Sequence, residues 1–150
     1  MTEAVDSGLV VRSSVTVALP RREAFRLFTE RVATWWPLES HSVFGDEATG
    51  LQLEPHVGGR FYETTDDGRT SEWGAVTEWQ PDERLALTWY PGQSPEHATQ
   101  LSISFHEVSG GTRLDLVHTG WAARGADAPK IAKNYQVGWE IVLGRYIAAA

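Results

Sequence analysis

A change in hydrophobic period along the chain limits the possible folds more than any other feature. Between residues 51 and 119, apolar and polar residues alternate in short runs, and turn-forming segments such as 66–69 and 110–111 separate these runs. Such alternation is typical of strands that bury one face and are joined by hairpins. Between residues 131 and 146 the apolar residues recur every three or four positions instead, which predicts a long helix with one buried face.

Two elements precede this run of strands. Valines alternate with polar residues over 11–17, which predicts a first strand. Pro20 suits the first turn of a helix, and apolar residues at helical spacing predict that this helix continues to Pro37. Residues 38–50 are rich in Ser, His, Gly, Asp and Thr and are predicted to form a loop. This order of elements predicts an α+β domain whose terminal helix packs on one face of an antiparallel sheet.

The alternation also predicts which side chains share a face. One face of a central strand should carry Trp73, Ala75, Thr77 and Trp79. His118 falls on the apolar face of the last strand, so we expect it to point into the interior unless a β-bulge precedes it.

Composition narrows the class of protein. A chain of 150 residues with 41% hydrophobic residues fits a single domain, residues 1–150, in which residues 1–8 are expected to be flexible. The formal net charge of -7 disfavours nucleic acid as a partner, and the absence of cysteine excludes thiolate chemistry and disulfides. The N-terminus is acidic and no apolar run is long enough to span a membrane, so we expect a cytoplasmic protein that does not insert into membranes.

Tryptophan is unusually frequent, with seven residues in the chain. The indole rings fall on apolar faces or at the ends of elements, and each buries a large area while keeping one N–H donor. They either fill a wide core or line a cavity that binds a flat or apolar ligand, and the sequence leaves both possibilities open.

Few residues suggest acid-base chemistry. An inward-facing His118 could act as a general acid or base, or could be a buried imidazole whose nitrogens are both hydrogen-bonded, and we favour the second interpretation. Glu63 is expected to point inward beside Phe61, whereas Glu72 and Glu78 fall on predicted solvent faces. The spacing therefore predicts no pair of catalytic carboxylates.

No metal site is predicted either. The histidines lack the spacing that holds zinc, and His41 beside Glu39 and Asp46 is the only local group of possible ligands. Ser40 and Ser42 flank this histidine, but adjacency in sequence does not make a catalytic triad, which needs a base oriented by a third group. We expect no cofactor.

Four segments together resemble a known family: VGGRFYE at 57–63, WGAVTEWQPDERLALTW at 73–89, HTGW at 118–121 and GWEIVL at 138–143. With the order of elements, they resemble the START-like or SRPBCC superfamily over about residues 10–147, and within it the AHSA-type branch named for the activator of the heat-shock-protein ATPase. The resemblance implies a helix-grip fold, in which a curved antiparallel sheet of about six or seven strands surrounds a long C-terminal helix and leaves an apolar cavity.

The first functional hypothesis is therefore binding of a small hydrophobic or aromatic molecule in this cavity. We expect eleven residues to contact that ligand: Trp35, Trp36, Phe44, Phe61, Trp73, Trp89, Phe105, His118, Trp121, Tyr135 and Trp139. The loops 39–50, 91–95 and 120–129 are candidate gates.

Two alternatives remain. The chain could be a cyclase, dehydratase or hydrolase that uses His118 as its acid-base group with Tyr135 or Glu63 as a partner. It could instead be a co-chaperone-like interaction domain with a chaperone partner, as the branch name suggests. This third hypothesis ranks lowest, because the co-chaperone engages its chaperone through a further domain and 150 residues leave no room for one.

Overall fold

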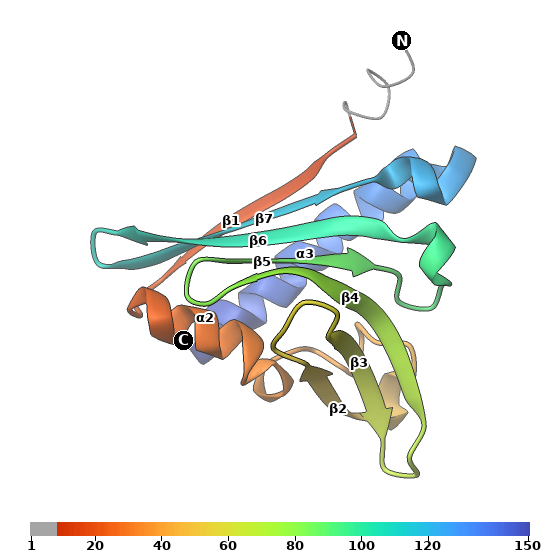
Figure 1. The fold of residues 1–150 in the computed structure, drawn as a ribbon, viewed down its shortest axis with the longest axis horizontal. Coiled ribbons are helices and arrows are strands. Elements are labelled where there is room, and N and C mark those ends of the chain that lie inside the picture. The colour runs from red at the N-terminus through yellow and green to blue at the C-terminus, as the bar shows by residue number, and fades with distance from the viewer. Residues whose placement is uncertain (1–8) are drawn as a thin grey trace.

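A computed structural model describes residues 9–150, so the predicted flexibility of residues 1–8 falls outside the described part (Figure 1). The strands are β1 (Val11–Val17), β2 (Ala48–Leu53), β3 (Arg60–Thr65), β4 (Thr70–Gln80), β5 (Arg84–Trp89), β6 (Thr99–Val108) and β7 (Gly111–Thr119). The α-helices are α2 (Arg21–Thr29) and α3 (Ala128–Ala149). Short 3-10 helices are η1 (Val32–Thr34), η2 (Gly45–Glu47), η3 (Pro95–His97) and η4 (Trp121–Asp127).

The strands form one antiparallel sheet in the order β1-β7-β6-β5-β4-β3-β2. Strands β2 to β7 are a simple meander, and β1 pairs with β7 at the far edge, so α2 and η1 carry the chain from one edge of the sheet to the other. Helix α3 runs along one face of this curved sheet, as Figure 1 shows. The predicted α+β helix-grip architecture is confirmed.

Strand β4 contains two β-bulges. The register with β3 shifts between Phe61 and Tyr62, and the register with β5 shifts between Val76 and Glu78, so β4 carries an extra residue at each place. Each extra residue reverses which side of the strand faces inward and bends the strand. The predicted shared face was therefore wrong in part: Trp73 and Val76 are buried, whereas Thr77 points to solvent.

Gly74 lies at the first of these bulges, close to the backbone of β5. A Cβ atom at this position would stand 1.9 Å from the carbonyl oxygen of Thr88. We expect Gly74→Ala to destabilise the protein by about 2 kcal/mol, because the strands must separate to admit the methyl group. Gly144→Ala is the matched control, since its Cβ would meet no atom within 4 Å and alanine favours a helix. Urea unfolding of both variants tests this, and equal stabilities would contradict it.

Helix α2 is shorter than predicted. It ends at Thr29, and the chain continues through η1 before Trp35, instead of remaining helical to Pro37. The turn places Trp35 Nε1 so that it donates a hydrogen bond of 2.8 Å to the carbonyl oxygen of Leu27. That carbonyl is among the last of α2 and would otherwise lack a partner at the helix end. The apolar residues that follow Thr29 are buried, as their spacing predicts, but they lie beyond the end of the helix.

Residues 120–129, expected to form a loop, are largely helical. Gly120 adopts a φ of 79°, and η4 follows it with a kink at Gly125 before α3 begins. Helix α3 then packs its buried face on the sheet, and Tyr146 near its end donates a hydrogen bond of 2.8 Å to the carbonyl oxygen of Ala24. Burial raises the pKa of Tyr146 above its usual value. This contact joins α3 to α2 and closes one end of the core.

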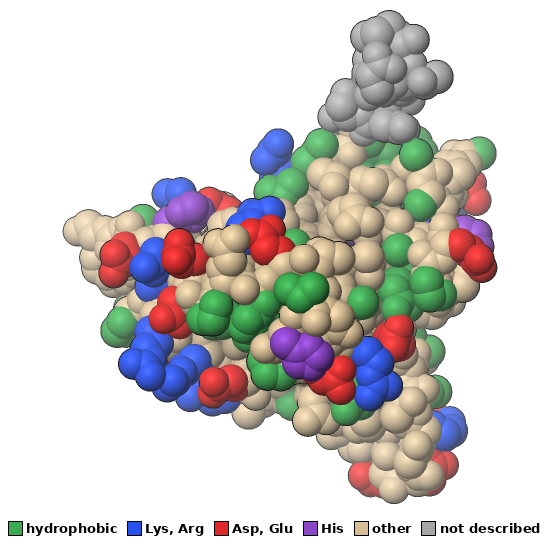
Figure 2. Space-filling model, in the orientation of Figure 1, with side chains coloured by type: hydrophobic (Ala, Val, Ile, Leu, Met, Phe, Trp, Pro, Cys, Tyr) green, Lys and Arg blue, Asp and Glu red, His purple; other side chains and the backbone are tan. Residues whose placement is uncertain are grey.

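The surface carries charges of both signs. Figure 2 shows acidic and basic side chains lying close to one another on the left and lower parts of the viewed face, without a continuous basic stripe. None of the helices within residues 9–150 combines the length and the apolar composition needed to cross a lipid bilayer.

Candidate functional site

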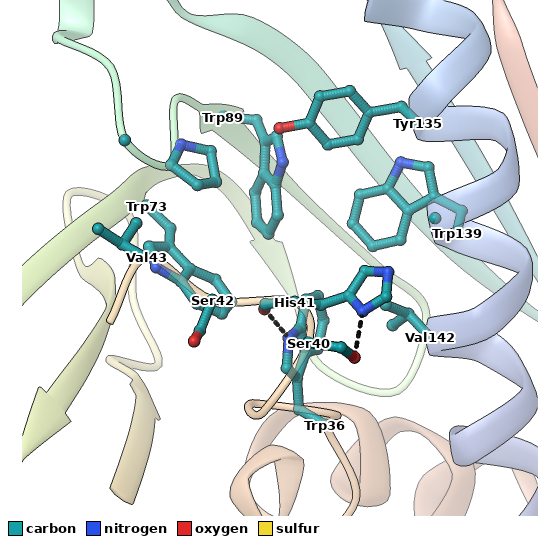
Figure 3. Close-up of a pocket in the computed structure, with 13 residues that line it drawn as sticks. Trp36, Ser40, His41, Ser42, Val43, Trp73, Trp89, Tyr135, Trp139 and Val142 are labelled. Carbon is teal, nitrogen blue, oxygen red and sulfur yellow. Dashed lines mark hydrogen bonds between the residues drawn. The ribbon is translucent and has the colours of Figure 1, made fainter. Parts of the chain in front are cut away.

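An aromatic cavity of about 360 Å³ lies between the sheet and α3 (Figure 3). Its walls are aromatic: Trp36, Trp73, Trp89, Tyr135 and Trp139. Two loops form the rest of the wall with Ser40, His41, Ser42, Val43, Pro91 and Gly92, and α3 adds Gly138 and Val142. Its size falls within the range of small-molecule sites. Val43 is 43% exposed, so the loop that carries it lies where the cavity meets solvent.

The four indole rings of the cavity form a contiguous cluster. Trp36 lies 5.2 Å from Trp73 and 5.9 Å from Trp139 between ring centroids, and Trp89 lies 5.4 Å from Trp139. The interplanar angles range from tilted to edge-on, which suits the quadrupoles of aromatic rings. The cluster therefore supplies rigid, mostly apolar surface to the cavity.

Three of these four indoles use their N–H groups within the protein. Trp36 Nε1 donates to the carbonyl oxygen of His41 at 2.8 Å, Trp73 Nε1 donates to Glu63 at 2.6 Å, and Trp139 Nε1 donates to His118 Nδ1 at 3.0 Å. Trp89 Nε1 is buried and has no partner among the described residues. Each bonded indole is fixed in orientation by its partner, so the rings form a preorganised wall.

Glu63 anchors both the wall and the loop. This fully buried carboxylate accepts hydrogen bonds from the backbone N–H groups of Val43 (2.6 Å) and Phe44 (3.0 Å), in addition to Trp73 Nε1. Burying a carboxylate is unfavourable unless several donors satisfy it, and three do so here. Glu63 thus joins β3, β4 and the cavity loop at one point.

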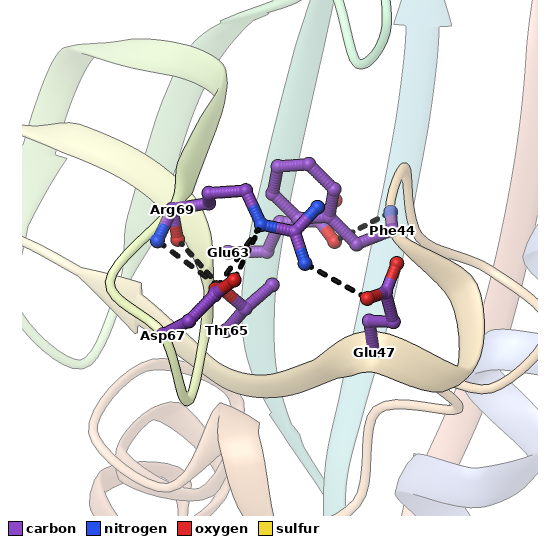
Figure 4. Close-up of polar contacts among 6 residues, drawn as sticks. All are labelled: Phe44, Glu47, Glu63, Thr65, Asp67 and Arg69. Atoms are coloured by element: carbon purple, nitrogen blue, oxygen red, sulfur yellow. Dashed lines mark hydrogen bonds and ion pairs between the residues drawn. The ribbon is translucent and has the colours of Figure 1, made fainter.

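A second contact holds the same loop from outside. The Arg69 guanidinium lies 5.1 Å over the ring of Phe44 and pairs with Glu47 at 2.9 Å and Asp67 at 3.1 Å (Figure 4). A hydrogen bond from Thr65 and a pair of hydrogen bonds from Arg69 hold the pKa of the Asp67 carboxyl below its usual value. The β3–β4 hairpin therefore supports the loop that borders the cavity.

His118 points inward as its register predicts, and it is fully buried. Its Nδ1 accepts from Trp139, so its Nε2 carries the proton and donates to Thr99 Oγ1 at 2.6 Å. Thr99 Oγ1 in turn donates to the carbonyl oxygen of Trp89 at 3.1 Å. Burial, and after it the nearby charge of Arg124, lowers the pKa of His118 to about 3. The imidazole is neutral at ordinary pH, and both of its nitrogens are occupied.

The cavity contains five of the eleven residues predicted to contact a ligand: Trp36, Trp73, Trp89, Tyr135 and Trp139. The other six lie outside its lining: Trp35, Phe44, Phe61, Phe105, His118 and Trp121. Among these, Trp35 and Phe105 pack against Phe28 in the core. Phe61 packs against Trp36 and Trp73 of the indole cluster. Trp121 covers His118, with ring centroids 4.2 Å apart.

The prediction from sequence missed the polar residues of the cavity. Ser40, His41 and Ser42 line it, and they were missed because they lie in a loop with no periodic pattern. Only the expectation that loops 39–50 and 91–95 are gates pointed to these residues. Both loops contribute to the lining. The third expected gate, 120–129, contributes nothing to it.

The local group around His41 does not converge on one point. Glu39 pairs with Arg145 of α3 at 2.9 Å, and the hydrogen bond from Arg145 lowers the pKa of the Glu39 carboxyl. Within residues 9–150, no three His, Asp or Glu side chains come together as metal ligands would. The cavity instead offers stacking surfaces and a few polar atoms.

Comparison with known proteins identifies the family of this chain. A family model described as "Activator of Hsp90 ATPase homolog 1-like protein" matches residues 18–150. The solved structure of Txn09, an anthrahydroquino-gamma-pyrone synthase, is 40% identical, with 83% of this chain and 84% of that chain covered and a TM-score of 0.59. A search of curated proteins found no match.

Two further structures share the fold at low identity. Protein MLL2253 from Mesorhizobium loti is 17% identical, with 93% and 94% of the two chains covered and a TM-score of 0.69. The Aha1 dimer from Colwellia psychrerythraea is 15% identical, with 89% and 90% covered and a TM-score of 0.63.

Proposed function

Because the chain belongs to the family of activator of Hsp90 ATPase homolog 1-like proteins, and a fold does not by itself fix an activity, we propose a function from its cavity: binding of a planar aromatic molecule. The observation that carries this proposal is the cavity of about 360 Å³ walled by four indoles and one phenol ring. A ligand with flat apolar faces suits such a wall, because it packs against aromatic rings and covers the apolar surface that the lining still exposes.

The fixed N–H groups support the same ligand class. Trp36, Trp73 and Trp139 already donate to protein acceptors, so their exposed surfaces toward the cavity are ring faces and edges. Preorganised side chains lose little conformational entropy on binding, which raises affinity without further contacts. The likeness to Txn09, a synthase of a fused aromatic product by its name, points to ligands of similar shape.

A second candidate is an enzyme that converts such a molecule in the same cavity, and the 40% identity to Txn09 favours it. In this candidate His118 serves as a positioning residue, because it is buried outside the cavity lining and both ring nitrogens are engaged. A chaperone-directed role has weaker support, since the 15% identity to Aha1 concerns the fold alone.

The direct test is a titration of the intrinsic tryptophan fluorescence with anthraquinone, a planar tricyclic probe without hydroxyl groups. Saturable quenching with a one-to-one stoichiometry is expected, because four of the seven tryptophans line the cavity. Linear quenching equal to that of free tryptophan amide would reject the proposal.

Filling the cavity should abolish this binding. Gly138 lies on the cavity side of α3, so we expect Gly138→Leu to place its side chain in the cavity beside His41 and to weaken binding at least about tenfold. Gly144→Leu is the matched control, because a side chain there meets open space on the same helix. The fluorescence titration measures both variants, and equal affinities would place the ligand elsewhere.

A further inference from the structure

The cavity contains very few polar atoms that are free to meet a ligand. Ser42 Oγ donates to the carbonyl oxygen of Leu38 at 2.6 Å and accepts from the N–H of Gly45 at 2.9 Å, so it is already engaged. Among the lining residues, only His41 and Tyr135 carry titratable side chains. Of these two side chains, only a neutral imidazole carries a nitrogen lone pair that can take up a proton.

The structure holds the His41 ring at the cavity wall. Its Nδ1 shares a hydrogen bond of 2.7 Å with Ser40 Oγ, and its carbonyl oxygen accepts the Trp36 N–H. On its other edge, Cδ2 and Nε2 are the nearest atoms to the position that a Cβ of Gly138 would occupy, at 3.8 Å. Because position 138 has no side chain, no Cβ covers the Nε2 edge, and Figure 3 shows the ring between Ser40 and α3, beside Val142 in the cavity lining.

We propose that His41 Nε2 accepts the proton of a hydroxyl group on the bound aromatic molecule, a proposal that rests on the proposed binding function. The site would then select hydroxylated aromatic molecules. In the tautomer that this requires, Nδ1–H donates to Ser40 Oγ and the Nε2 lone pair faces the ligand. A hydroxyl held there first donates a hydrogen bond. When the proton transfers, the O–H bond breaks, its electron pair stays on the ligand oxygen, and the new N–H bond makes an imidazolium.

The resulting ion pair would lie at the edge of the cavity, because His41 is only half-buried. The two charges attract each other beside a mostly apolar lining with less screening than in water, and this attraction has to offset the hydration that both groups lose. The Glu39 carboxylate lies near His41 and pairs with Arg145, which adds charges of both signs outside the cavity wall. A phenolate prepared in this way is a stronger nucleophile than the phenol, so His41 would also be the catalytic base if the cavity carries out a reaction.

The test uses 2-hydroxyanthraquinone beside anthraquinone, because the phenolate of the first absorbs at longer wavelength than its phenol. At a pH where the free probe is mainly protonated, binding to the unchanged protein should shift its absorption to the phenolate band. We expect His41→Asn to abolish this shift and to weaken binding of the hydroxylated probe about tenfold. Binding of anthraquinone, which has no hydroxyl to donate, should weaken less than binding of the hydroxylated probe, so the preference for the hydroxylated probe should fall.

His97→Asn is the matched control. His97 is also a loop histidine whose Nδ1 hydrogen-bonds a serine, Ser94, at 3.0 Å, but it lies outside the cavity lining. This variant should keep both the shift and the affinity. Thermal unfolding of the two variants checks that each is folded.

The outcomes separate the two proposals. Failure of both probes to bind the unchanged protein would reject the proposed function. Binding of both probes without the phenolate band, or an undiminished band in His41→Asn, would overturn the role of His41 and leave the binding function standing.

Discussion

Lowering the pH from 7 to 4 is expected to remove about 3 kcal/mol of folding stability through His118 alone. The folded protein holds the pKa of this imidazole at about 3, against 6.5 for a free histidine, because burial disfavours the charged form. Between these two values the unfolded chain binds the proton and the folded chain does not, so acid favours unfolding. The contribution is fully present above pH 6.5 and declines as the pH falls toward 3.

Urea unfolding at pH 7, 5.5 and 4 measures this effect, but carboxylates titrate in the same range. His118→Gln isolates the histidine, because the variant keeps a polar side chain and lacks the titration. It should be less stable than the unchanged protein at pH 7, since Trp139 or Thr99 loses its partner. Its loss of stability between pH 7 and 4 should be smaller by about 3 kcal/mol. Parallel pH profiles would show that His118 is already solvated in the folded state.

Removal of the Glu63 side chain should be among the most damaging single changes in the chain. Glu63→Ala leaves three N–H donors without their acceptor, those of Val43, Phe44 and Trp73, around a side chain that is fully buried in the unchanged protein. We expect a loss of about 3 to 5 kcal/mol in the free energy of unfolding. Any ligand affinity should fall as well, because Trp73 and Val43 both line the cavity.

Glu63→Gln is the finer probe of the same site. One amide oxygen can still accept from two donors, while the amide N–H₂ opposes the third, so a smaller loss of about 1 to 3 kcal/mol is expected. Glu96→Gln is the surface control, because Glu96 is exposed on η3, and its effect should stay below about 0.5 kcal/mol. If Glu63→Ala unfolds at the same urea concentration as this control, the carboxylate does not organise the loop.

The fold was predictable because its signals are local and repeated. Each hairpin alternates apolar and polar residues between recognisable turns, and the stripe from Trp139 to Tyr146 marks the buried face of α3. What failed depends on contacts between distant residues. The bulges of β4 arise from its fit between β3 and β5, and α2 ends where Trp35 can reach back to Leu27. Neither feature leaves a periodic trace in the sequence.

For the candidate site, the sequence predicted the aromatic character of the cavity but not which residues line it. Aromatic residues on inward faces were expected to meet around a cavity, yet burial does not distinguish a residue of the wall from one of the core. Trp35 and Trp36 are adjacent in sequence, but only Trp36 lines the cavity. His41 was visible only as a loop residue, because its place beside Gly138 depends on how α3 crosses the sheet.

The close spacing of the four cavity indoles has a photophysical consequence. With neighbouring centroids between 5.2 and 6.3 Å apart, an excitation absorbed by one ring can migrate to the others before it is emitted. The cluster then behaves as one chromophore with depolarised emission, and its coupled transitions add an exciton signal to the circular dichroism. One molecule seated among the rings would quench all four together and alter that signal, so the protein carries its own optical reporter of occupancy.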